Sequence, residues 1–196
     1  MSKSFFILAP LSAFFLILIT SGFDTKKASP KLSQANLGEK LFFDPILSSD
    51  QSISCASCHK PEFAFADHVA FSNGVNGKKT ARNTPSVMNM AMRDALFWDG
   101  RASSLEEQVI GPIQNPNEMN LPFSTAVKRI QLSKKYQHWF NEVYHKNPDS
   151  ASIVNCIAEF ERTLETDQTP SDRWLSDLPN GLTAQQIRGR ELFTSE

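Results

Sequence analysis

The chain has 196 residues, enough for one or two small domains. Its 20 Lys and Arg residues nearly balance its 21 Asp and Glu residues. The resulting net charge of −1, with both signs interspersed, excludes the basic surface of a typical nucleic-acid-binding protein. The 15 Phe and 11 Pro residues indicate many bulky apolar anchors and many breaks in regular structure.

The N-terminal segment has the pattern of an export signal. Residues 1–23 open with a lysine, continue through a run of Phe, Leu and Ile, and end on the small residues 20–22. An uncleaved membrane anchor is the alternative, because the apolar run is just long enough to span a bilayer, although Pro10 interrupts it. Either reading exports the remaining chain, which begins with a polar linker over residues 24–33.

The first predicted element is a short helix from Gln34 to Phe43. Leu37 and Leu41 share one face of this helix, and Gly38 allows another helix to approach closely. The dipeptide Asp44-Pro45 is predicted to end it, because the residue before a proline disfavours helical geometry.

The segment Cys55-Ala56-Ser57-Cys58-His59 has the C-x-x-C-H pattern of c-type haem attachment, and we call it the haem motif. Two thiols three positions apart can form thioether bonds to the two vinyl groups of one porphyrin. His59 then lies where its imidazole can bind the iron. The other face of the iron is left to the rest of the chain, and that face decides between electron transfer and chemistry.

The paired cysteines also fit two other kinds of site less well. A closed zinc site needs four ligands, and a thioredoxin-like redox pair needs a βαβ context that the sequence lacks. The remaining Cys and His residues show no second paired spacing; they are Cys156, His68, His138 and His145. If haem takes the first two cysteines, Cys156 is left single and fits a small buried apolar residue on a helix.

The segment that follows the haem motif is predicted to be rich in loops. Residues 73–77 form a turn-rich loop, and a helix is predicted over residues 86–92. Ser104 and Glu107 form a capping-box pattern that begins another helix, and Gly111-Pro112 is predicted to end it. Three phenylalanines can wall a porphyrin or pack as ordinary core: Phe63, Phe65 and Phe71.

The C-terminal half is predicted to be helical. Residues 124–145 fit two short helices, and residues 150–165 fit an amphipathic helix with apolar side chains every three or four positions. Thr169-Pro170 ends that unit. Almost nothing in the chain alternates with period two, so the fold is predicted to be mostly α.

Two distant segments echo each other. Residues 189–193, Gly-Arg-Glu-Leu-Phe, repeat the pattern of residues 38–42, Gly-Glu-Lys-Leu-Phe, and a capping box at Thr183 precedes the second copy. A chance match is the alternative to a repeated unit. From the echo we expect an N-terminal haem domain over residues 34–178. We expect residues 179–196 to begin a second cytochrome c-like domain, cut before its own haem motif.

Several segments together resemble the bacterial di-haem cytochrome c peroxidases and the related methylamine dehydrogenase-maturation enzymes. The most specific pattern is FWDGR at residues 97–101, followed by Gln108 and then by Glu118. The resemblance covers residues 37–196 and about the N-terminal half of the family's length. The matching segments are LGEKLFFDP (37–45), CASCH (55–59), RNTPSVMN (82–89), FWDGRASSLEEQ (97–108), GPIQNPNEM (111–119), EFERTL (159–164) and DRW (172–174).

The resemblance implies a class I cytochrome c-like haem domain with peroxidase activity in the periplasm. Hydrogen peroxide would be reduced to water with electrons from a small exported cytochrome c or a cupredoxin. One haem c would be held in this chain, with a second expected in the full-length protein, and a homodimer is compatible with the family. Cys55, Cys58 and His59 would bind the haem at which peroxide reacts, and Met119 would lie in its pocket.

The same resemblance implies roles for four further residues. Glu118 matches a distal carboxylate that can move a proton between peroxide oxygens, and Gln108 matches a distal amide that can orient peroxide. Trp98 matches an indole between two haems, and Asn83 matches a ligand of calcium. From the residues alone, Glu118 also fits a solvated loop charge and Trp98 also fits ordinary core packing.

One position departs from the family pattern. Members that need reductive activation carry a distal histidine in the loop before R-N-x-P, and the corresponding position here is Val75. His68 lies seven residues earlier as an unsupported substitute. We therefore predict a distal site that is open or holds water, and not an iron bound by two histidines.

An electron-carrier cytochrome c domain without peroxidase activity is the alternative function. A carrier needs a second axial ligand, which is usually Met or His. Met88, Met90 and Met92 are candidates, although a spacing of two scatters them around a helix.

Overall fold

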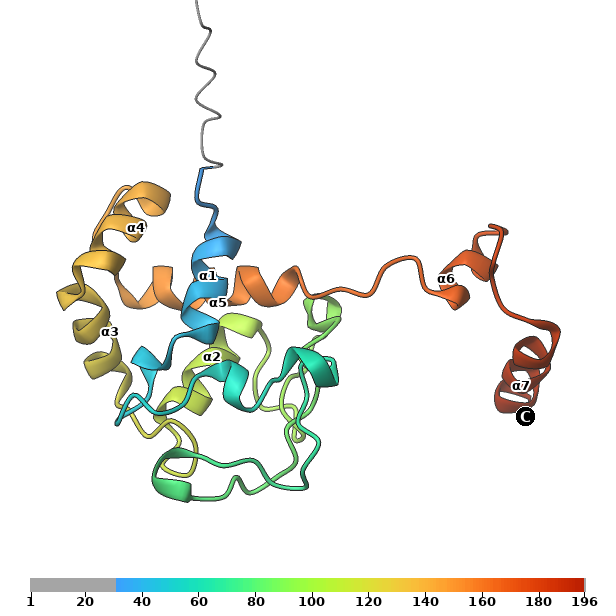
Figure 1. Cartoon of the computed structure of the whole chain (residues 1–196), viewed down its shortest axis with the longest axis horizontal. Helices are drawn as coiled ribbons and strands as arrows, with labels where there is room; N and C mark the ends of the chain where they lie inside the picture. The colour runs from blue at the N-terminus through green and yellow to red at the C-terminus, as the bar shows by residue number, and fades with distance from the viewer. Residues whose placement is uncertain (1–30, 196) are drawn as a thin grey trace, which may run out of the picture. The chain divides into compact units, whose positions relative to one another are not determined.

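The computed structural model describes residues 31–195. The predicted signal or anchor (1–23) and most of the predicted linker (24–33) lie outside the described residues. The described part is built of helices and short 3-10 turns joined by long loops, which confirms the mostly α prediction (Figure 1). The α-helices are α1 (Gln34–Phe43), α2 (Leu105–Gln114), α3 (Phe123–Leu132), α4 (Lys134–Tyr144), α5 (Ser150–Arg162), α6 (Pro170–Leu175) and α7 (Ala184–Thr194).

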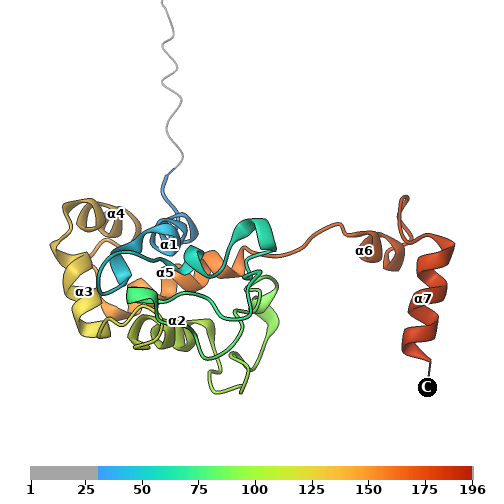
Figure 2. The same cartoon turned by 60° about the horizontal axis from the view of Figure 1, so that its bottom comes forward.

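The centre of the fold is the contact between α1 and α5, which lie against each other in both views (Figures 1 and 2). The two backbones touch at Gly38, as the sequence predicted: a Cβ built there would lie 1.8 Å from the carbonyl oxygen of Cys156. Beside this contact the rings of Phe42 and Phe160 pack edge to face, with centroids 5.1 Å apart. Only a glycine permits this approach.

Helix α5 begins at a capping box that the sequence analysis did not identify. The side chain of Asp149 accepts a hydrogen bond from the backbone N–H of Ser152 (2.9 Å), and the Ser152 hydroxyl accepts one from the N–H of Asp149 (3.1 Å).

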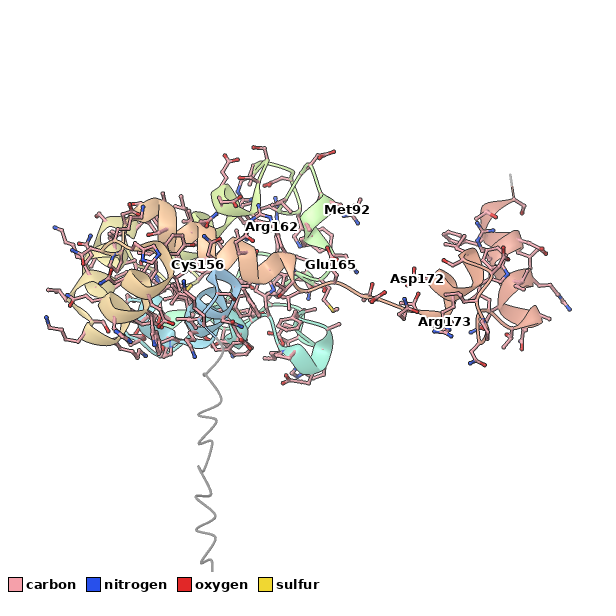
Figure 3. The ribbon with its side chains drawn as sticks, turned by 90° about the horizontal axis from the view of Figure 1, so that it is seen from above. Met92, Cys156, Arg162, Glu165, Asp172 and Arg173 are labelled. Carbon is pink, nitrogen blue, oxygen red and sulfur yellow. The ribbon has the colours of Figure 1, made fainter. Side chains whose placement is uncertain are left out.

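Further along the helix, Cys156 is fully buried and acts as a small apolar residue (Figure 3). The main apolar core surrounds α1 and α5 and includes Leu37, Leu41, Ile113, Ile130, Tyr136, Phe140, Ile153 and Ile157.

The helix predicted over residues 86–92 is wrong. Only Met90–Met92 form a 3-10 turn, and Asn89 before it adopts a left-handed backbone with φ of 59°. Partners other than a helix take the backbone N–H groups of this segment: the Ser86 hydroxyl accepts from the N–H of Met88 (3.1 Å), and the carbonyl of Leu164 accepts from the N–H of Asn89 (2.7 Å).

The predicted end of α2 is also wrong, because the helix continues through Gly111-Pro112 to Gln114. Pro112 removes only one backbone donor, and the small Gly111 makes room for a ring from outside the helix. A Cβ on Gly111 would lie 2.8 Å from Cζ of Phe97. The packing of Phe97 against this turn outweighs the local tendency of the Gly-Pro pair to end a helix.

The two helices predicted in residues 124–145 are present as α3 and α4, whereas α5 ends three residues before the predicted residue 165. Helix α7 begins at the predicted capping box of Thr183 and Gln186 and carries the repeated segment 189–193. Phe193 is 91% exposed, whereas its counterpart Phe42 is fully buried. Among the helices of residues 31–195, none combines the length and apolar character that crossing a bilayer requires.

Candidate haem site

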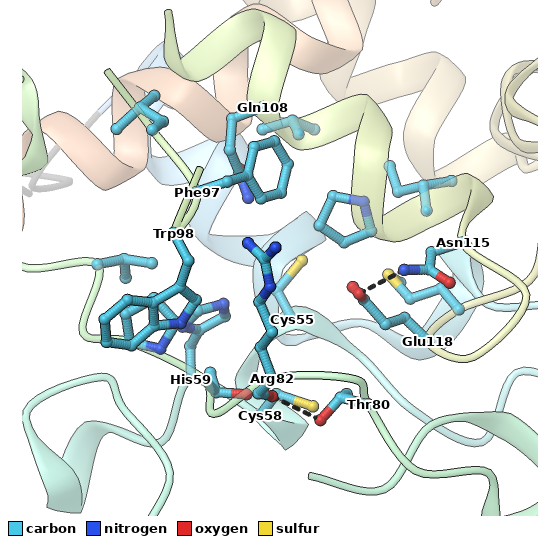
Figure 4. Close-up of a pocket in the computed structure, with 18 of the residues that line it drawn as sticks. Cys55, Cys58, His59, Thr80, Arg82, Phe97, Trp98, Gln108, Asn115 and Glu118 are labelled. Carbon is cyan, nitrogen blue, oxygen red and sulfur yellow. Dashed lines mark hydrogen bonds between the residues drawn. The ribbon is translucent and has the colours of Figure 1, made fainter. Parts of the chain in front are cut away.

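A cavity of about 380 Å³ lies between the haem motif, the loop that runs through residues 80–90 and helix α2 (Figure 4). This volume is within the range of small-molecule sites in proteins, about 300–1,000 Å³. All eight residues to which the resemblance assigns a role line this one cavity; they are Cys55, Cys58, His59, Asn83, Trp98, Gln108, Glu118 and Met119.

A tight turn gathers both thiols and the imidazole of the haem motif on one wall. Residues Cys55–Ser57 form a 3-10 turn, and the N–H groups of Cys58 and His59 both donate to the carbonyl of Cys55, at 3.1 and 2.9 Å. The Ser57 hydroxyl accepts from the N–H of Ser54 (2.9 Å) and fixes the start of the turn. Both cysteines are free thiols, as thioether formation requires.

The imidazole of His59 is held by a backbone acceptor. Its Nδ1 lies 3.0 Å from the carbonyl oxygen of Phe65, which can only accept, so Nδ1 carries the proton and Nε2 is left free to bind a metal. Ala64 and Phe65 both have left-handed backbones, with φ of 53° and 55°, in the turn that presents this carbonyl. Burial lowers the pKa of His59 and favours the neutral form that a ligand needs.

Glu118 enters the cavity from the loop after α2, away from the wall that carries His59 (Figure 4). Its Oε1 accepts a hydrogen bond from the amide of Asn115 (2.7 Å), and its carbonyl accepts from the N–H of Val75 (2.9 Å). Burial raises the pKa of Glu118, while the hydrogen bond from Asn115 and the charge of Arg101 lower it less. The solvated-charge alternative is therefore wrong, because this carboxyl is half-buried and held in place by Asn115.

The other residues singled out take separate positions around the cavity. Gln108 projects into it from α2 (Figure 4), and Met119 is buried at its lining. Trp98 is 64% exposed, so the core-packing alternative is wrong for this residue. The indole N–H of Trp98 donates to the carbonyl of Asn83 (2.8 Å), and the Asn83 amide donates to the carbonyl of Val69 (2.9 Å).

Val75, the position that departs from the family pattern, lies apart from the cavity. Val75 is fully buried and does not line it, and the exposed ring of His68 packs on Phe63 with centroids 4.5 Å apart. Of the histidines in the described chain, His59 alone lines the cavity. Within residues 31–195, no group of three or more His, Cys, Asp or Glu side chains is arranged to hold a metal ion.

Three polar residues of the cavity were missed from the sequence. Asn115 fixes Glu118, Arg82 reaches into the cavity and donates to Asp99 (3.1 Å), and Glu161 lines the cavity from α5. A signal existed for Glu161, since it lies one helical turn after Ile157 on the apolar face of its helix. Loop residues such as Asn115 and Arg82 carry no such periodic signal.

The family model for di-haem cytochrome c peroxidases matches residues 32–179, which include the whole cavity. The chain belongs to the di-haem cytochrome c peroxidase family. Membership implies haem c, and the cavity fits it, because two free thiols and the imidazole of His59 share one wall.

Relatives of this peroxidase family show the extent of the match. The chain is 39% identical to a cytochrome c551 peroxidase of Nitrosomonas europaea over 160 residues, covering 81% of this chain and 48% of the relative. It is 38% identical to the methylamine utilization protein MauG of Methylorubrum extorquens over 173 residues, covering 87% and 49%. A crystal structure of a MauG-like protein associated with microbial copper homeostasis matches with a TM-score of 0.76 and 28% identity, covering 88% and 55%. The chain thus spans about half the length of these relatives.

The buried carboxylate of Asp67 accepts hydrogen bonds from the loops on either side of it, close to the haem motif. Asp67, with a side chain 2% exposed, accepts from the ammonium of Lys60 (2.7 Å) and the hydroxyl of Ser72 (2.6 Å). The Ser72 hydroxyl in turn lies 2.8 Å from that of Thr84. Burial raises the pKa of Asp67, but these hydrogen bonds outweigh it and hold the pKa at about 2.

We expect Asp67→Asn to lower the free energy of unfolding by about 2 kcal/mol at pH 7. The folded pKa lies below the unfolded value of about 3.9, so the stabilisation is present above pH 4 and is lost as the pH falls towards 2. Urea unfolding of both proteins at several pH values measures the difference, with the exposed Asp94→Asn as control. A difference that stayed constant down to pH 2 would contradict this account.

Proposed function

We propose that this chain reduces hydrogen peroxide to water, with electrons from a small exported cytochrome c or cupredoxin in the periplasm. The supporting observation is one cavity in which the haem motif occupies one wall while Gln108 and Glu118 enter from another (Figure 4). A haem held by Cys55 and Cys58 and bound by His59 would supply a redox-active iron with one vacant coordination position. The overall reaction consumes one peroxide, two electrons and two protons and yields two waters.

The residues that line the cavity have distinct tasks in this proposal. Glu118 takes a proton from one peroxide oxygen and delivers it to the other, and Asn115 keeps the carboxyl in place. Gln108 hydrogen-bonds peroxide and orients it. Trp98 gives an electron route, because its largely exposed indole lies at the cavity and is fixed by the carbonyl of Asn83.

We also propose a calcium site and a second domain. Asn83 would bind calcium through its side-chain oxygen, since only its nitrogen is engaged in the hydrogen bond to Val69. Residues 34–178 would form the peroxidatic domain, and residues 179–196 would begin a second cytochrome c-like domain that brings a second haem. Both echo segments lie in helices that begin at a capping box, which supports a repeated unit. The protein would function as an exported monomer or homodimer.

An electron carrier is the second candidate function, because Met90 and Met119 line the cavity and the thioether sulfur of either could bind the iron as its second axial ligand.

We expect the haem-loaded chain to keep its Soret absorption through acid–acetone extraction and to bind cyanide with a spectral shift. Met90→Leu and Met119→Leu should leave the spectrum of the oxidised protein unchanged. Loss of a sulfur-ligand signature in either variant would favour the carrier, and a low-spin spectrum of two histidine ligands would refute the vacant site.

A further inference from the structure

Helix α5 places a carboxyl at the cavity that the proposed mechanism does not use. Glu161 is 5% exposed and lines the cavity together with Ile157, one turn earlier on the same helix, and with Cys55 of the haem motif. Among the described residues, no donor or acceptor lies within hydrogen-bond distance of its Oε2. A buried carboxylate without a partner is costly, so this oxygen is expected either to hold a proton or to face a charge that is not in the protein chain.

The cationic residue next in sequence does not neutralise this carboxyl. Arg162 (Figure 3) is engaged by Glu106 of α2, at 2.8 Å, and by Glu159, at 2.9 Å. Burial is the main cause that raises the pKa of Glu161 to about 8; the charge of Glu106 adds to the rise and that of Arg162 opposes it.

The other elements that pack on α5 bring little charge to this point. The charged residues of α1 are Glu39 and Lys40, and both are exposed. The turn Met90–Met92 carries no charged side chain, and Arg129 of α3 donates to backbone carbonyls of residues 46, 48 and 49. The motif contributes Cys55, whose thiol would be consumed by thioether formation with the haem. The remaining charged side chains of the cavity are Arg82, Asp99, Arg101 and Glu118.

We propose that Glu161 binds the proton that accompanies reduction of the haem iron in this cavity. In this step one electron from an external donor reduces ferric to ferrous iron. One proton from solvent forms an O–H bond on the Glu161 carboxylate. Oxidation reverses both transfers, so the net charge of the buried site stays constant. The proposal rests on the haem binding of the proposed function and not on peroxide turnover.

The physical reason is the low dielectric of the site. An added electron raises the pKa of a nearby carboxyl because like charges repel strongly where water is excluded. The midpoint potential of the haem must therefore fall as the pH rises. This fall occurs in the pH range between the pKa of Glu161 in the oxidised protein and its pKa in the reduced protein. The limiting slope is about 59 mV for each tenfold fall in proton concentration, the constant for one electron.

The test is a spectroscopic redox titration of the haem-loaded chain, with dithionite and mediators, from about pH 6 to about pH 10. We expect a falling potential in the wild-type protein and a flat potential around neutral and alkaline pH in Glu161→Gln. Glu39→Gln is the matched control, because it removes an exposed carboxyl of α1 outside the cavity and should keep the slope. A flat wild-type profile, or a slope that persists in Glu161→Gln, overturns the proposal.

A second measurement on the wild-type protein does not depend on how the variant folds. Redox-induced infrared difference spectra should show a protonated carboxyl band that grows on reduction and shifts in D₂O. Absence of that band overturns the proposal even if Glu161→Gln fails to load haem. A pH-dependent potential in a chain that does not turn over peroxide would instead reject the proposed function and leave this inference standing.

Discussion

Replacing Glu118 with glutamine is expected to leave haem content unchanged and to lower peroxide turnover at least about tenfold. Proton transfer by a positioned carboxyl contributes about 10²–10⁴ in rate, and the amide cannot accept and release the peroxide proton. Glutamine keeps the shape of the side chain and can still hydrogen-bond Asn115, whose amide lies 2.7 Å from Oε1 in the native chain. The measurement is steady-state turnover with a reduced artificial donor, normalised to haem absorbance.

The matched control for this variant is Glu39→Gln, because Glu39 is an exposed carboxylate on α1 outside the cavity. It loses the same charge without touching the site and should turn over at the native rate. Unchanged turnover in Glu118→Gln would remove this residue from the mechanism. Equal losses in both variants would point to the overall charge of the chain instead.

Gly38→Ala is expected to destabilise the folded protein strongly. The new methyl group would lie 1.8 Å from the carbonyl oxygen of Cys156, which is backbone and cannot rotate away, so α1 and α5 must move apart. Overpacking of this kind typically costs about 1–3 kcal/mol, and the backbone contact places this site at the upper end or beyond. The free energy of unfolding in urea measures the effect, and the yield of haem-loaded protein should fall with it.

Gly189→Ala is the matched control, because Gly189 holds the same position in residues 189–193 as Gly38 holds in residues 38–42. A Cβ on Gly189 meets nothing within 4 Å, so alanine should raise the stability of α7 slightly through its helix propensity. If the two substitutions had equal effects, the contact between α1 and α5 would not be the cause.

Much of the helical framework could be predicted because its signals are local. The apolar spacing in α5, the capping box before α7 and the small residue at position 38 all depend on near neighbours in the sequence. Two of the errors arose where distant parts of the chain decide the local structure. Phe97 packs over the Gly111 turn and lets α2 continue, and Asn89 bonds to Thr166 where a helix was expected.

The candidate site was predictable to a different degree. Cys55, Cys58 and His59 could be predicted from the residues alone, because the C-x-x-C-H spacing is typical of c-type haem attachment. Glu118 and Gln108 could be singled out only through the resemblance to a family, since a loop carboxylate has no periodic or spacing signal of its own. Glu161 could not be assigned to the site from the sequence, although its helix was predicted. The apolar spacing shows that Glu161 lies on the buried face of α5, but not that this face borders the cavity.

The backbone contact between α1 and α5 also bears on the order in which the protein matures. Gly38 and Cys156 are more than a hundred residues apart in the sequence, so this joint cannot form until most of the chain has emerged. The two cysteines near residue 55 precede α5 by almost as much, and α5 supplies part of the wall over them. The two thiols thus stay accessible from solvent until α5 has been made, so the proposed haem would have to reach them before the core closes.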